Sequence, residues 1–290
     1  MIRFAAFADE ACSSLEGQIA ALHRNQISYL ELRSLDGVNV LDISEEQAKK
    51  YAERFREEQI RVWSIGSPLG KVDISCDFEA YREKVRHICR LARIFETDKI
   101  RIFSFFEAYE SEERVFTYLS EMVNIAEEYG VRLYHENEKK IYGDTVDRVL
   151  RVCENVRGLR FIYDPVNYLE SGDDVSNALE RLYGITDYFH IKDIVVSTGE
   201  RVPAGFGDAM IGELIDSIGT DDRVITLEPH LTVFQGFSEI DGGSLKSRFY
   251  YTDSQEAFDA AAESLKQLLL ARGYVYNKND GGFEKNESRN

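Results

Sequence analysis

The stretch YFHIKD, Tyr188–Asp193, is typical of a short strand, yet it ends in polar and charged side chains. It lies in the longer run ITDYFHIKDIVV, residues 185–196, whose β-branched and aromatic residues favour a strand. His190, Lys192 and Asp193 therefore stand in a segment that we expect to be buried. Two interpretations are open at this point: an ordinary half-exposed strand, or a strand that ends at a site where polar groups are needed.

Strand-like runs of this kind recur at regular intervals along the chain. They are Ile2–Phe7, Ser28–Arg33, Arg61–Ile65, Lys99–Ser104, Val131–Glu136, Arg160–Asp164, Tyr188–Lys192 and Arg223–Glu228. Helix-like segments separate them; Phe78–Phe95, for example, repeats apolar residues at helical spacing. Strict alternation of strands and helices predicts a parallel sheet with right-handed crossovers.

Eight such repeats in 290 residues predict an α/β fold, a single (β/α)8 TIM barrel. We expect residues 1–276 to form the barrel domain, and the polar tail, residues 277–290, to be disordered and without a role. A doubly wound open sheet is the alternative. The first strand-like run is followed by Ala8, Asp9 and Glu10 rather than by a glycine-rich loop, which argues against the dinucleotide-binding version of the open sheet.

The charge of the chain limits its partners. The chain carries 52 acidic and 35 basic residues, a net charge of −17, and such a surface repels nucleic acid and anionic lipid. No apolar run approaches the roughly 20 residues of a membrane span, and the N-terminal residues lack the apolar core of a secretory signal. We therefore expect a cytoplasmic protein whose partner is a cation or a small polar molecule, with no nucleic acid and no membrane involved.

Four consecutive strands deliver a potential metal ligand to the same end of the expected barrel. The four residues are Glu136, Asp164, His190 and Glu228. Each closes an apolar run, and the reacting groups of TIM barrels lie at these carboxyl ends. Any one alone is more typical of a solvated strand end, but burying three carboxylates together is costly without a cation. This hard ligand set predicts one divalent ion, with Mn²⁺ favoured among Mn²⁺, Mg²⁺, Co²⁺ and Zn²⁺.

The motifs around these positions resemble a known family. Glu-Asn at 136–137, Asp-x-x-Asn at 164–167, His-x-Lys-Asp at 190–193 and the final glutamate, Glu228, are similar to the xylose isomerase-like barrel superfamily, in particular its sugar phosphate isomerase/epimerase branch. The resemblance extends from Ile2 to Gly273. It implies that the four residues above hold one divalent metal and that Asn167 contacts substrate. Glu138 stands where many members carry histidine, which bears on the substrate more than on the metal.

Endonuclease IV shares this barrel and resembles the chain at the same four positions, but its three-metal site requires further histidines. The sequence has Asn167 at one such position and no histidine in residues 63–70 or 102–107, at the ends of the third and fourth strands. Together with the acidic charge, these differences argue against DNA repair.

The resemblance implies proton transfer next to a carbonyl group. We predict a divalent-metal-dependent isomerase or epimerase of a sugar, sugar acid or sugar phosphate, acting in carbohydrate metabolism through an enediolate. Glu136 and Glu228 are the candidate catalytic base and acid. A lyase on the same metal site, such as an inosose-type dehydratase or a C-glycoside-cleaving enzyme, is the alternative, because the same intermediate can expel a leaving group. A non-catalytic, ligand-binding barrel is a third possibility, and a homo-oligomer is a family expectation.

Three residues are candidates for substrate binding: Asn167, Lys192 and Arg33. Lys192 can reach substrate oxygens, although an ion pair with Asp193 is equally open. Arg33 ends the second strand and can reach the substrate or pair at the barrel floor. The long aromatic-rich connection Pro229–Asp253 follows the last strand, and both a lid and a packed surface flap are open for it.

Overall fold

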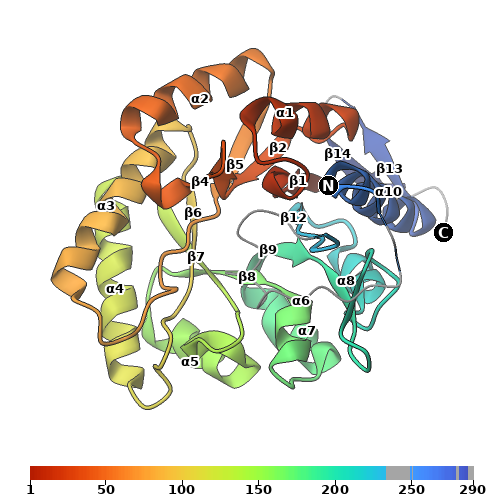
Figure 1. The fold of residues 1–290 in the computed structure, drawn as a ribbon. Helices are drawn as coiled ribbons and strands as arrows, with labels where there is room; N and C mark the ends of the chain where they lie inside the picture. The colour runs from red at the N-terminus through yellow and green to blue at the C-terminus, as the bar shows by residue number, and fades with distance from the viewer. Residues whose placement is uncertain (233–248, 250, 279–280, 287–290) are drawn as a thin grey trace.

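The computed structural model describes residues 1–232, 249, 251–278 and 281–286. Eight parallel strands close into a barrel surrounded by helices (Figure 1). The strands, in their order around the barrel, are β1 Ile2–Ala6, β2 Tyr29–Leu32, β5 Arg61–Ile65, β6 Lys99–Ile102, β7 Arg132–Glu136, β8 Arg160–Tyr163, β9 Thr186–Ile191 and β12 Arg223–Leu227. Pairing of β12 with β1 closes the ring. The predicted (β/α)8 barrel is thus confirmed, and the open-sheet alternative is wrong.

The helices form the outer layer (Figure 1). The α-helices are α1 Leu15–Arg24, α2 Glu45–Glu57, α3 Phe78–Ile94, α4 Glu112–Glu128, α5 Val146–Asn155, α6 Pro165–Glu170, α7 Val175–Leu182, α8 Ile211–Ile218 and α10 Ser254–Ala271, and the 3₁₀ helices are η1 Ala8–Glu10, η2 Val40–Asp42, η3 Tyr142–Asp144 and η4 Tyr183–Ile185. The helical spacing in the sequence reflects this arrangement: α3 buries Val85 and Ile88 and exposes Glu83 and Lys84. Within the described part of the chain, no helix combines the length and the apolar character needed to cross a membrane.

The interior of the barrel is divided into two layers, because alternate residues of a strand point to the same side. An apolar cluster, which we call the aromatic floor, consists of Ala5, Tyr29, Tyr134, Ile162, Tyr188 and Val224, with Trp63 against it. Two residues further along their strands come Glu31, Glu136, His190 and Thr226, all buried. Register keeps the layers aligned, since Tyr188 pairs with Val224 and His190 with Thr226. The aromatic floor is therefore followed, two residues further along these strands, by a charged layer at the carboxyl end of the barrel.

Two hairpins interrupt the alternation of strands and helices, and the sequence did not predict them. Their strands are β3 Ser34–Leu35 with β4 Val38–Asn39, and β10 Asp193–Val195 with β11 Glu200–Val202. Because β9 ends at Ile191 and β10 begins at Asp193, Lys192 lies between two strands rather than inside one.

The prediction of disorder for the tail, residues 277–290, is wrong for Gly282–Lys285. These residues form β14, which pairs with β13, Tyr274–Asn277, and also with the beginning of β1. Since β2 pairs with β1 only at Ala5 and Ala6, the first residues of β1 would otherwise present an unpaired edge. The tail covers that edge and buries Phe283.

The sequence left two interpretations for the connection Pro229–Asp253 after β12, a lid and a packed surface flap. Most of this connection lies outside the described residues. Residues 229–232, 249 and 251–253 are described. Of these, Leu231 is buried in the main hydrophobic core.

Replacing Phe283 by alanine should destabilise the protein by about 3 kcal/mol, because it removes a buried aromatic ring from the edge of β1. Phe283 is 1% exposed, and its ring lies against those of Phe4 and Tyr276, with centroid distances of 6.4 and 5.3 Å. Urea unfolding measures the change. Val275→Ala is the control, since Val275 is 52% exposed in the same hairpin. Equal effects of the two substitutions would contradict packing of β14 on the barrel.

Candidate metal centre

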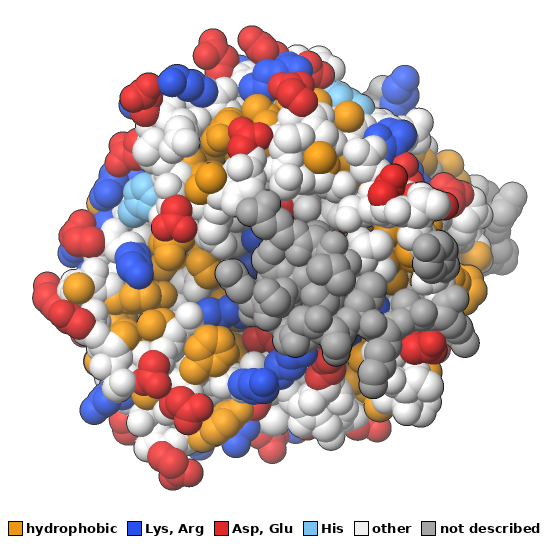
Figure 2. Space-filling view, in the orientation of Figure 1, with side chains coloured by type: hydrophobic (Ala, Val, Ile, Leu, Met, Phe, Trp, Pro, Cys, Tyr) orange, Lys and Arg blue, Asp and Glu red, His pale blue; other side chains and the backbone are white. Residues whose placement is uncertain are grey.

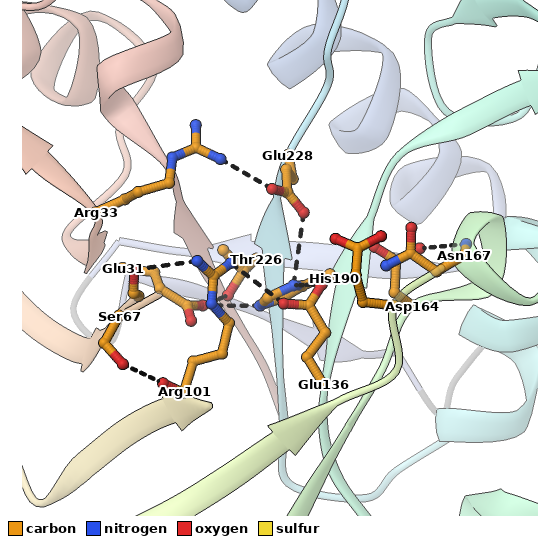
Figure 3. Close-up of polar contacts among 12 residues, drawn as sticks. Glu31, Arg33, Ser67, Arg101, Glu136, Asp164, Asn167, His190, Thr226 and Glu228 are labelled. Carbon is orange, nitrogen blue, oxygen red and sulfur yellow. Dashed lines mark hydrogen bonds and ion pairs between the residues drawn. The ribbon is translucent and has the colours of Figure 1, made fainter. Parts of the chain in front are cut away.

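The structure brings the four predicted ligands together at the carboxyl ends of neighbouring strands (Figure 3). Glu136 ends β7, Asp164 directly follows β8, His190 lies in β9 and Glu228 directly follows β12. One ligand atom from each lies within 4.8 Å of the others, and all four side chains are buried. The arrangement is the one expected of a metal site.

The donor atoms fit a divalent cation. Three buried carboxylate oxygens accept no hydrogen bond from the described residues: Glu136 Oε2, Asp164 Oδ2 and Glu228 Oε2. Two side-chain cations lie near them, Arg101 at 3.2 Å from Glu136 Oε2 and Lys192 Nζ at 3.0 Å from Asp164 Oδ2 and 3.9 Å from Glu228 Oε2. Buried carboxylate oxygens without hydrogen-bond donors are costly. Three such oxygens and one imidazole form the hard donor set that Mn²⁺ and Mg²⁺ prefer.

Neighbouring charges shift the pKa values of the cluster. Burial by itself would raise the pKa of Glu136, but the positive charges of His190 and Arg101 outweigh burial and lower it to about 2. Burial lowers the pKa of His190, but its carboxylate neighbours outweigh burial and raise it to about 10. For Asp164, burial dominates over the attraction of Lys192 and raises the pKa to about 6. The carboxylates are thus held in unequal electrostatic environments.

His190 lies between two carboxylates. Its Nδ1 is 2.9 Å from Glu136 Oε1, and its Nε2 is 3.1 Å from Oε2 of Glu31, a residue of β2. Glu31 is fully buried and was not predicted as a site residue. The sequence signal that could have indicated Glu31 is a glutamate between Leu30 and Leu32 in an apolar strand. Strand alternation places it on the same side of the strand as Tyr29.

Arg33 connects Glu228 to a second acidic group. Its guanidinium bonds to Asp9, Glu10 and Glu228 at 2.9, 3.3 and 2.9 Å. The structure therefore places Arg33 beside the candidate centre and not at the barrel floor. Glu10, Glu228 and His230 also bring potential ligand atoms within 4.8 Å of one another, but here the Arg33 guanidinium already supplies a positive charge to both glutamates.

Lys192 pairs with Asp164 rather than with Asp193. Asp193 instead organises the loop that follows β10 and β11, because its carboxylate accepts hydrogen bonds from the backbone amides of Gly205, Gly207 and Ala209. Of the two roles open for Lys192 in the sequence, the ion pair with Asp193 is thus wrong. The ammonium group lies at the candidate metal centre.

Asn137 and Asn167 join the ends of β7 and β8. The Asn137 amide accepts from the backbone N–H of Asp164 and donates to its carbonyl, both at 2.9 Å. Asn167 donates to the Asn137 carbonyl at 2.8 Å, and its own backbone N–H bonds to the Asp164 carboxylate, which caps α6. Asp164 Oδ1 is thereby fixed, and Oδ2 is left facing the cluster.

The remaining histidines lie elsewhere. His135, adjacent to Glu136, points to the opposite side of β7, where its Nε2 is 2.9 Å from the Ser104 hydroxyl. His23 of α1 pairs with Glu58, and His87 of α3 lies 3.0 Å from the Ile43 carbonyl. A cavity of about 710 Å³, lined by Trp63 and Lys99 among others, shares no residue with either group of potential ligands.

The fold and this buried group of carboxylates and imidazole define a TIM barrel with a candidate metal centre at the carboxyl ends of its strands. Residues 19–268 match the family described as xylose isomerase-like TIM barrel, so the chain belongs to this family. The resemblance to the xylose isomerase-like superfamily, inferred from the sequence motifs, is thereby confirmed.

Several solved structures share the fold. L-ribulose 3-epimerase aligns with a TM-score of 0.72 at 18% identity, over 93% of this chain and 95% of that chain. The probable 3-DHS dehydratase AsbF from Bacillus anthracis gives 0.71 at 17%, over 92% and 99%. The IolI protein with a bound zinc atom gives 0.71 at 15%, over 93% and 99%. No curated protein matches the sequence. At these identities the likeness establishes the fold alone.

Asn137→Ala should destabilise the protein by about 3 kcal/mol, because the backbone N–H and carbonyl of Asp164 lose their partners in the interior, at about 1–3 kcal/mol each. Denaturant unfolding gives the free energy of unfolding. Asn155→Ala is the matched control: Asn155 is exposed, and its side chain makes one hydrogen bond to the Arg151 carbonyl. That change should stay within about 0.5 kcal/mol. Similar losses for both variants would contradict the bridging role of Asn137.

Proposed function

We propose that this chain is a divalent-metal-dependent isomerase or epimerase of a sugar, sugar acid or sugar phosphate. The observation that carries the proposal is the buried cluster of three carboxylates and one imidazole, whose ligand atoms lie within 4.8 Å of one another. The membership of the xylose isomerase-like family supports it, as do the epimerases among the structures of the same fold. Manganese is the favoured ion for such an oxygen-rich site.

Small polar substrates fit the surface better than nucleic acid does. Acidic and basic side chains are interspersed over the face drawn in Figure 2, with no broad basic area among the residues described there. The net charge of −17 agrees with this. D-allulose, the ligand in one structure of the same fold, a D-allulose 3-epimerase from Methylomonas sp., is a substrate of the proposed kind.

Glu136, Asp164, His190 and Glu228 would hold the ion, which when bound supplies a Lewis acid for the negative charge that develops on a carbonyl oxygen. Glu136 and Glu228 approach from different strands, and in each case positive neighbours outweigh burial and lower the pKa. Both therefore rest as carboxylates. In an isomerase, one of them would take the proton from the carbon next to the carbonyl and return it to the neighbouring carbon. In an epimerase, the glutamate on the opposite face would first gain a proton from solvent and deliver it to the carbon, while the first glutamate releases the proton that it took to solvent.

The residues around the cluster have supporting roles. Burial lowers the pKa of Lys192, but Asp164 and Glu228 outweigh burial and raise it, so the ammonium stays charged and can donate to a substrate oxygen. Arg33 holds Glu228 through a 2.9 Å contact, and any contact with substrate would be in addition to that role. Asn167 can contact substrate only through atoms that its bond to Asn137 leaves available.

A lyase on the same site is the second candidate, and the probable dehydratase among the structures of the same fold favours it. Elemental analysis followed by a screen of keto-sugars and keto-acids in D₂O would separate the candidates. Deuterium exchange next to the carbonyl without loss of a group supports the isomerase or epimerase. Release of water or another group supports the lyase. A chain with no bound metal and no exchange would contradict both and favour a non-catalytic barrel.

Glu136→Gln and Glu228→Gln should each lower the rate of deuterium exchange at least about 100-fold, because each removes a group that transfers the proton. The rate is measured by NMR on the substrate found in the screen. Glu121→Gln is the control, since Glu121 lies on α4 and pairs with Arg82 of α3, away from the cluster. Full activity in both site variants would overturn the assignment of Glu136 and Glu228.

Mn²⁺ at about 100 times its dissociation constant should stabilise the wild-type chain by about 2.7 kcal/mol, because the ion binds the folded state alone. Asp164→Asn should lose this stabilisation. Asparagine caps helices as well as aspartate does, so α6 keeps its cap while the metal loses a charged ligand. Urea unfolding with Mn²⁺ and with EDTA provides the measurement, and an equal Mn²⁺ effect in both proteins would rule out Asp164 as a ligand.

A further inference from the structure

Glu31 is a fully buried carboxylate in the barrel interior that belongs to neither group of potential metal ligands. It extends from β2, on the far side of His190 from Glu136 (Figure 3). A charged side chain with no exposed surface requires a function or a complete set of partners. Its contacts show how it is used.

Both oxygens of Glu31 are engaged. Oε1 accepts a hydrogen bond from the Tyr188 hydroxyl at 3.0 Å, and Oε2 accepts from the Thr226 hydroxyl at 2.9 Å. Oε2 also lies 3.1 Å from Nε2 of His190. The carboxylate is therefore fixed in place from three sides, and it offers an acceptor at one defined position of the histidine ring.

The other ring nitrogen of His190 faces the cluster. Nδ1 lies 2.9 Å from Glu136 Oε1 and 3.6 Å from Glu228 Oε2. The rings of Phe7 and Tyr188 stand against the imidazole, at centroid distances of 5.2 and 5.6 Å, and restrict its rotation. A neutral imidazole has one N–H and one lone pair, and the hydrogen bond made by one nitrogen decides which nitrogen is left to bind a metal.

We propose that Glu31 is the positioning residue that keeps the proton on Nε2 of His190 and thereby presents Nδ1 to the metal. The inference rests on the proposed function, because it presupposes a metal at the cluster. A carboxylate bonded to the far nitrogen of a histidine ligand fixes the ring and raises its basicity, and losing such a partner weakens metal binding about 10- to 100-fold. Thr226 and Tyr188 hold Glu31 in turn, so the chain of contacts runs from the aromatic floor to the metal cluster.

Two substitutions test separately the position and the charge of the Glu31 carboxylate. Glu31→Asp keeps the charge but withdraws the carboxylate from Nε2 by one methylene, and Glu31→Gln keeps the length but removes the charge. Isothermal titration with Mn²⁺, Co²⁺ and Zn²⁺ salts should give dissociation constants about 10- to 100-fold higher for both variants than for the wild type. The visible absorption spectrum of the Co²⁺ form should also change, because it reports the geometry of the ligands. A far-UV circular dichroism spectrum and a urea unfolding curve of each metal-free variant establish that the titrated chain is folded.

Tyr274→Phe is the control, because it removes a buried tyrosine hydroxyl that donates to the Ile215 and Gly219 carbonyls, outside the cluster. It should lower stability but keep the wild-type affinity and the wild-type Co²⁺ spectrum. If a folded Glu31 variant also kept both, Glu31 would merely fill the interior, and the positioning role would be overturned while the proposed function stood. If the wild-type chain bound none of the three ions, the proposed function and the role of Glu31 would both be overturned.

Discussion

The structure depends on balancing several carboxylates that are buried at one end of a barrel. Glu136, Asp164 and Glu228 each present an oxygen to a common point, and a charge left unpaired in such an interior is destabilising. The protein meets this constraint by giving each carboxylate a partner for its other oxygen. Glu136 has His190, Asp164 has a backbone amide of the helix it caps, and Glu228 has Arg33. The oxygens that remain lie close together and accept no hydrogen bond from the described residues, which is why a divalent cation suits the centre.

The aromatic floor offsets the destabilising effect of these buried carboxylates. Closely packed rings fill the amino-terminal part of the barrel, and their burial provides the hydrophobic stabilisation that the charged layer does not. Tyr188 belongs to both layers: its ring packs against Trp63 and Tyr134, and its hydroxyl bonds to Glu31. Strand alternation then places the next inward residue of the same strand, His190, directly in the cluster. The position of the histidine is thus set by the packing of the floor below it.

The sequence predicts those features of the fold and of the candidate site whose signal lies in a short stretch of residues. Apolar runs indicate the strands, and the four candidate ligands stand out because each closes such a run. Closure of the barrel then brings these four side chains together. Glu31 and Arg101 were missed because they lie inside their strands; alternation predicts the side on which they lie, but not the partner they meet. The pairing of β14 with β1 joins residues at the two ends of the chain, and no local pattern indicates it. Lys192 was placed in a strand because the apolar run continues past it, whereas Asp193 starts a hairpin by binding three amides of a later loop.

The arrangement of charges also bears on the choice between isomerase and lyase. Elimination needs a base for the carbon-bound proton and, for a basic leaving group, a donor that can give up a proton. The cluster offers carboxylates on two sides, and the ammonium group of Lys192 lies 3.0 Å from Asp164 and 3.9 Å from Glu228. An ammonium held by two carboxylates remains charged and stabilises a negative oxygen by hydrogen bonding rather than by transferring its proton. The proposed isomerase or epimerase needs no proton donor at a leaving oxygen, so the charges around Lys192 agree better with that proposal than with the proposed lyase.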